Sequence, residues 1–95
     1  VPLVAVVGET VINGRIDRLL VEPGLVRAVD FKTGRSIPSD ENGVPVPHLR
    51  QMAHYRAALQ TIFPDCKIEV ALLFTHAPRF ITLSDEILAP YYPAS

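Results

Sequence analysis

A Pro-Gly pair between two apolar, β-prone segments restricts the fold more than any other feature of this chain. The pair consists of Pro23 and Gly24. Proline followed by glycine suits the two central positions of a tight turn, so we expect a β-hairpin with this pair at its tip. The turn sets the register of the two strands, and counting outward from it places Asp17 opposite Asp30.

This register brings two like charges to the same face of the hairpin, with Cβ atoms about 4.5–5.5 Å apart, which destabilises a sheet. Two carboxylates among apolar neighbours either share a proton or hold a cation, and a divalent metal ion resolves the conflict. Lys32 follows Asp30 by two residues and therefore points to the same face. A lysine beside a metal can position water and offset charge on phosphorus. The spacing alone also fits a structural cluster, in which Lys32 neutralises Asp30 and Asp17 pairs with Arg15 or Arg18.

Apolar periodicity predicts one helix among several strands. We expect strands at residues 2–7, 10–21, 25–31, 68–75 and 80–83, a helix at 48–63 and a short helix at 85–88. Residues 33–47 are rich in turn-forming residues and predict an irregular loop that is longer than most connections. This order of elements indicates an α+β or mixed α/β fold.

Composition limits the possible functions. The 95 residues are 48% hydrophobic, enough for one domain with a core, and the net charge of −1 carries no overall signature of nucleic-acid binding. Cys66 is the single cysteine, which excludes an internal disulfide, a multi-cysteine zinc site and a cysteine-ligated iron–sulfur cluster.

The cysteine usage leads us to expect a reducing cytoplasm. We expect no membrane partner, because a membrane span needs about 20 apolar residues. Since the chain begins with Val1 inside an expected strand, we also expect a fragment of a longer polypeptide.

Three short motifs follow one another along the chain: G-x-x-D-R at residues 14–18, D-x-K-T at 30–33 and Q-x-x-x-Y at 51–55. Together they resemble the RecB-type branch of the PD-(D/E)XK nucleases. The similarity is greatest to the C-terminal nuclease domain of the AddA helicase–nuclease subunit of bacterial double-strand-break repair. It implies an α/β fold with a restriction-endonuclease-like core, in which a helix flanks a mixed central sheet. It also implies a single partial nuclease domain, residues 1–95, that lacks the first helix of the fold.

The resemblance assigns roles to the polar residues of the motifs. Five are implied to be catalytic: Asp17, Asp30, Lys32, Gln51 and Tyr55. The two carboxylates would bind a metal ion together with the backbone carbonyl of Phe31, and the lysine would assist the attacking water. The glutamine and the tyrosine share a helix face and would orient the substrate or the lysine. Family members carry a further metal ligand on a helix before the first strand; without it, we expect weak metal affinity and little or no activity.

The implied activity is that of a Mg²⁺-dependent DNA exonuclease, in which Mn²⁺ can substitute and metal-activated water hydrolyses phosphodiester bonds. The substrate would be single-stranded DNA that a linked helicase delivers, and ATP would act only through that upstream motor. The partner would be an AddB-type subunit, and the compartment a bacterial cytoplasm. The alternative is a non-catalytic scaffold with the nuclease fold that docks a partner subunit or DNA. A related nuclease that acts on RNA or nicks DNA fits the residues equally well.

Arg35 and the three histidines lie outside these three motifs. Arg35 follows the D-x-K-T motif, and we expect it to contact the phosphates of a substrate. His48, His54 and His76 have no metal-ligand spacing, so we expect them to be solvated or to cap helices.

Overall fold

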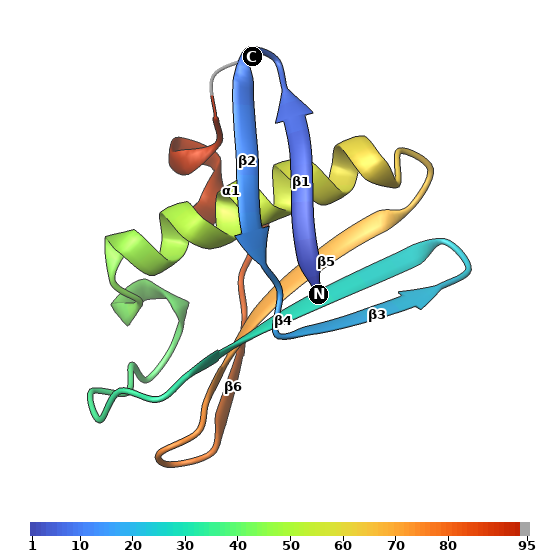
Figure 1. Ribbon diagram of the computed structural model, residues 1–95. Coiled ribbons are helices and arrows are strands. Elements are labelled where there is room, and N and C mark those ends of the chain that lie inside the picture. Colours follow the sequence, from blue (N-terminus) through green and yellow to red (C-terminus); the bar gives the residue numbers. More distant parts are fainter. Residues whose placement is uncertain (94–95) are drawn as a thin grey trace.

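The structure of the chain is a computed structural model that describes residues 1–93 (Figure 1). It contains two sheets, one long helix and short helical turns. The elements are β1 (Pro2–Val7), β2 (Thr10–Arg15), β3 (Arg18–Glu22), β4 (Leu25–Lys32), η1 (Glu41–Gly43), α1 (Val46–Ile62), β5 (Lys67–Phe74), β6 (Arg79–Thr82), α2 (Asp85–Leu88) and η2 (Ala89–Tyr91). No helix in the described part of the chain is long and apolar enough to cross a membrane.

The larger sheet has the strand order β3-β4-β5-β6. Strands β3 and β4 are antiparallel, with Glu22 opposite Leu25 and Arg18 opposite Val29, which confirms the register predicted from the turn. Gly24 at the tip has a φ of 76°, a conformation that glycine adopts readily. Strands β4 and β5 are parallel, and α1 forms the crossover between them. The sheet is therefore mixed and flanked by a helix, as predicted.

The prediction of one strand over residues 10–21 is wrong. The segment divides into β2, which pairs with β1 in a separate two-stranded sheet, and β3, which pairs with β4. Ile16 lies between them and is 1% exposed, with its backbone hydrogen-bonded to Val1. Burial of this side chain in the core turns the chain from one sheet into the other. Asp17, the next residue, consequently stands at the junction of the two sheets.

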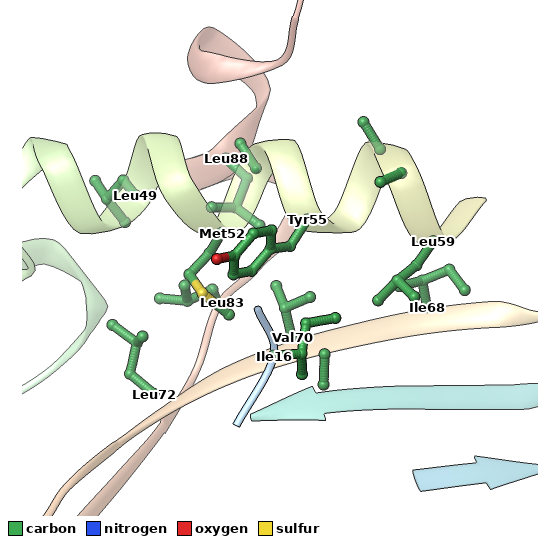
Figure 2. Packing of buried hydrophobic residues seen from close by; sticks show 14 of the residues in the cluster. Ile16, Leu49, Met52, Tyr55, Leu59, Ile68, Val70, Leu72, Leu83 and Leu88 are labelled. Atoms are coloured by element: carbon green, nitrogen blue, oxygen red, sulfur yellow. The ribbon is translucent and has the colours of Figure 1, made fainter. Parts of the chain in front are cut away.

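Helix α1 packs against both the β1–β2 hairpin and the larger sheet (Figure 1). It begins two residues before the predicted start and ends one residue before the predicted end, with Pro47 in its first turn. Figure 2 shows Met52, Tyr55 and Leu59 pointing from α1 toward the core over β5. Full burial of a side chain such as Met52 or Leu59 stabilises the fold by about 1.5–3 kcal/mol.

The loop over residues 33–47 is largely irregular, as predicted, but Val44 anchors it in the core and two sets of hydrogen bonds attach it to the rest of the domain. The Arg79 guanidinium donates hydrogen bonds to the carbonyls of Pro38 and Ser39. The Glu41 carboxylate accepts hydrogen bonds from the backbone N–H and the hydroxyl of Ser84, the residue that caps α2. These contacts hold the loop beside the end of β4 that carries Lys32.

Candidate active site

Asp30 and Lys32 lie at the C-terminal end of β4 on the face that α1 covers. Asp30 is 5% exposed, and its Oδ2 lies 2.7 Å from the Lys32 Nζ. The ammonium also donates a hydrogen bond of 2.8 Å to the Gln51 Oε1 on α1. The predicted convergence of Asp30, Lys32 and Gln51 is therefore present in the structure.

Asp17 reaches the same place from the junction between the sheets. Its Oδ2 accepts a hydrogen bond of 2.8 Å from the backbone N–H of Phe31, the residue between Asp30 and Lys32. The two carboxyl groups also interact with each other. The expectation that both lie among apolar neighbours holds only for Asp30, because Asp17 is exposed. Within residues 1–93, Asp17 forms no ion pair with Arg15 or Arg18, in contrast to the structural alternative.

The surroundings shift the pKa values of the two carboxyls in opposite directions. The hydrogen bond from the Phe31 N–H, followed by the contact with Asp30, lowers the pKa of Asp17. Burial raises the pKa of Asp30, although the adjacent Lys32 ammonium opposes this effect. The buried carboxyl therefore resists ionisation next to an ionised neighbour. A bound cation would relieve this conflict by favouring the charged form of both groups.

The donor set suits a hard cation better than zinc. The carboxylates of Asp17 and Asp30 and the backbone carbonyl of Phe31 are oxygen donors on adjoining parts of the chain. No group of three or more His, Cys, Asp and Glu side chains within residues 1–93 is arranged to hold a metal ion. Mg²⁺ is commonly bound through one or two carboxylates, with waters and substrate phosphates as the other ligands. The residues present therefore fit a hard divalent cation that completes its coordination with other oxygen ligands.

Tyr55 on α1 is buried, with 7% of the residue exposed, and its hydroxyl joins the helix to the end of β2. Its hydroxyl donates a hydrogen bond of 3.2 Å to the Arg15 carbonyl and accepts one of 3.3 Å from the Arg15 N–H. The Gln51 Nε2 donates to the same hydroxyl at 3.4 Å. Hydrogen bonds thus connect Asp30 through Lys32, Gln51 and Tyr55 to the strand end that precedes Asp17. The tyrosine holds this junction in place, and its hydroxyl is already bonded within the chain.

Gly14 makes the position of Tyr55 possible. A Cβ atom at Gly14 would lie 2.6 Å from the Tyr55 Cε1 and 2.7 Å from its hydroxyl oxygen. Contacts this short do not occur between real atoms of this kind, so only glycine admits the ring here. The first residue of the G-x-x-D-R motif and the last residue of the Q-x-x-x-Y motif are therefore a packed pair.

Two other residues had sequence-based expectations, Arg35 and His48. Arg35 is exposed and forms no hydrogen bond or ion pair with the described residues, so its phosphate contact stays a prediction. His48 was expected to be solvated or capping, yet it is half-buried one helical turn before Gln51. Burial lowers the pKa of His48, and the charge on Lys32 lowers it further. The three-residue spacing to Gln51 was the available sequence signal for this position.

A mixed sheet with a crossover helix carries Asp30 and Lys32 at the end of β4, with Asp17 beside them at the junction between the sheets, and this arrangement is that of a restriction-endonuclease-like fold. The family model of the PD-(D/E)XK nuclease superfamily matches residues 2–87. This chain therefore belongs to the PD-(D/E)XK nuclease superfamily. No curated protein and no solved structure matches the chain.

Proposed function

We propose that this chain is a metal-dependent nuclease domain that hydrolyses phosphodiester bonds in DNA. The observation that carries the proposal is the convergence of Asp17, Asp30 and Lys32, with the Lys32 ammonium 2.7 Å from Asp30 and 2.8 Å from Gln51. Superfamily membership supports a nuclease rather than another use of the same side chains.

Each residue has a defined part in this mechanism. Asp17 and Asp30, with the Phe31 carbonyl, would hold Mg²⁺, for which Mn²⁺ can substitute. The metal would supply Lewis-acid activation of the phosphodiester and of the attacking water. Lys32 is held by two neighbours, so its ammonium is oriented before the substrate arrives. That charge would offset the negative charge that builds up as water adds to phosphorus and the bond to the leaving oxygen breaks.

We further propose that residues 1–95 are a partial nuclease domain of a longer RecB-type or AddA-type helicase–nuclease. The support is the order of the three motifs, G-x-x-D-R, D-x-K-T and Q-x-x-x-Y. In this setting the substrate is single-stranded DNA delivered by the motor, and the enzyme is an exonuclease of double-strand-break repair in the bacterial cytoplasm. The partner is an AddB-type subunit.

Cleavage of end-labelled oligonucleotides tests the proposal. Single-stranded DNA, duplex DNA and RNA are each incubated with Mg²⁺ and a version of the chain extended toward the N-terminus, because residues 1–95 alone are expected to have little or no activity, and products are separated by length. Lys32→Ala should lower the rate about a hundredfold or more, because it removes charge stabilisation that acts in the transition state. Lys67→Ala is the matched control, since Lys67 is an exposed lysine at the far end of the same sheet. Cleavage that survives in Lys32→Ala would refute the mechanism, and preferential cleavage of RNA would refute DNA as the substrate.

One observation favours the non-catalytic scaffold. The charged groups of the site are already paired within the chain, Asp30 with Lys32 and Asp17 with the Phe31 N–H. Calorimetric titration of Mn²⁺ separates the two functions, with Asp30→Ala as the control. Heat of binding that disappears in Asp30→Ala supports the metal site, whereas no heat in the wild-type chain favours the scaffold or a missing upstream ligand. A version extended toward the N-terminus then distinguishes these last two explanations.

A further inference from the structure

His48 occupies the first turn of α1, on the side of the helix that faces the catalytic strand. Residues three apart on a helix are neighbours on its surface, so His48 lies beside Gln51. Gln51 in turn accepts a hydrogen bond from Lys32. The charges of Lys32 and Asp30 both act on the His48 imidazole.

Unlike its neighbours, the His48 side chain has no hydrogen-bond partner in the described part of the chain. Gln51 bonds to Lys32 through its oxygen and to Tyr55 through its nitrogen, so both ends of the amide are engaged. Lys32 uses two of its three N–H donors, on Asp30 and Gln51. The backbone N–H of His48 is bonded to the Pro45 carbonyl, which leaves only the ring for an outside partner. A half-buried ring without an internal partner is available to a ligand.

The chemistry of that ligand follows from the surroundings. Within residues 1–93, His48 does not form a group with Asp17 and Asp30 that is arranged to hold a metal ion. An imidazole has at least one N–H donor in both of its protonation states. The Lys32 ammonium, which bonds to the Gln51 side chain, has one N–H donor left after its bonds to Asp30 and Gln51. That donor could bind the same ligand as the His48 ring. Two donors side by side suit an anionic oxygen.

We propose that His48 is a substrate-binding residue whose ring N–H donates a hydrogen bond to a non-bridging oxygen of the phosphodiester engaged by Lys32. This inference rests on the proposed nuclease function and adds a contact from α1 to those from β4. The ligand is the phosphate backbone, so the contact is independent of base identity.

The test is the affinity for a fluorescein-labelled single-stranded DNA, measured by fluorescence anisotropy at low salt in EDTA, which prevents hydrolysis. His48→Ala should weaken binding about tenfold, the usual effect of losing a hydrogen bond to a charged group. His48→Asn keeps an N–H donor and should bind within about threefold of wild type. His54→Ala is the matched control, because His54 is a half-buried histidine two turns away on the same helix. Thermal melts of each variant verify folding.

The outcomes separate the two proposals. Equal binding by His48→Ala and wild type would overturn the His48 contact alone. The same would follow if His48→Asn bound as weakly as His48→Ala, or if His54→Ala lost as much affinity. Absence of binding by the wild-type chain would overturn the proposed function together with this contact. A loss in His48→Ala that His48→Asn restores and His54→Ala does not share is the expected result.

Discussion

Gly14→Ala should destabilise this protein, although the backbone at Gly14 suits any residue. Positive φ angles among the described glycines occur only at Gly8 and Gly24, so a side chain at Gly14 meets no conformational penalty. The added methyl group would instead meet the Tyr55 ring at 2.6 Å. The prediction therefore isolates one cause, the close approach of helix α1 to strand β2.

Two opposing effects set the size of the change. Alanine in a strand interior is more favourable than glycine by roughly 0.5–1 kcal/mol. Overpacking a buried contact costs about 1–3 kcal/mol. Displacement of the ring also strains the hydrogen bonds of 3.2 and 3.3 Å between Tyr55 and Arg15, each contributing about 0.5–1.5 kcal/mol. The unfavourable effects win, and we expect a net loss of about 1–2 kcal/mol.

Urea and thermal unfolding followed by circular dichroism measure this loss. In a domain of this size 1 kcal/mol lowers the Tm by about 4–8 °C. Gly34→Ala is the control, because a Cβ atom at Gly34 has no neighbour within 4 Å and its stability should stay the same or rise. If Gly14→Ala proved as stable as wild type, the ring would have room to move, and the argument that Tyr55 holds the Asp17 junction would be refuted.

Three further predictions concern the same network and the loop beside it. Tyr55→Phe removes the hydrogen bonds to Arg15 but keeps the ring, so the free energy of unfolding should fall by about 1 kcal/mol in urea melts; an unchanged value would contradict the supporting role of the hydroxyl. Burial raises the pKa of Asp30 in the folded state above 3.8, the value for an unperturbed aspartate. Between these two pKa values the folded state binds a proton more readily than the unfolded state. In EDTA, the free energy of unfolding should therefore rise as the pH falls through this window. Asp17, with its lowered pKa, contributes stability that is complete above pH 3.8 and is lost below it. Urea melts against pH for wild type and Asp30→Asn check both signs, and a rise that persists in Asp30→Asn would refute the assignment. Arg79→Ala should speed hydrogen exchange in residues 36–40 with a stability loss below about 1 kcal/mol, and unchanged exchange would show that the loop holds without this contact.

The central part of the site was predictable because it depends on local rules. The Pro23–Gly24 turn sets the register of β3 on β4, and the two-residue period of a strand places Lys32 on the face of Asp30. The four-residue spacing of Gln51 and Tyr55 puts both on one side of α1. Each rule relates residues a few positions apart or across one tight turn, so no long-range packing had to be known.

Other features were decided only by packing between distant segments. The break at Ile16 arises because its side chain is taken into the core between α1 and the sheet, a choice that the β-prone residues around it do not reveal. The contact of Tyr55 with Gly14 and the hydrogen bond of Gln51 with Lys32 depend on how α1 crosses both sheets.

Local sequence rules were thus enough to predict the strand pairing around the turn, the shared face of Asp30 and Lys32, and the class of fold. How Asp17 is held follows only from the packing of the whole domain, because its junction is held by a tyrosine 38 residues further along the chain. This division reflects the range of the forces involved. Backbone periodicity and turn geometry act over a few residues, whereas burial and close packing join whichever segments the fold brings together.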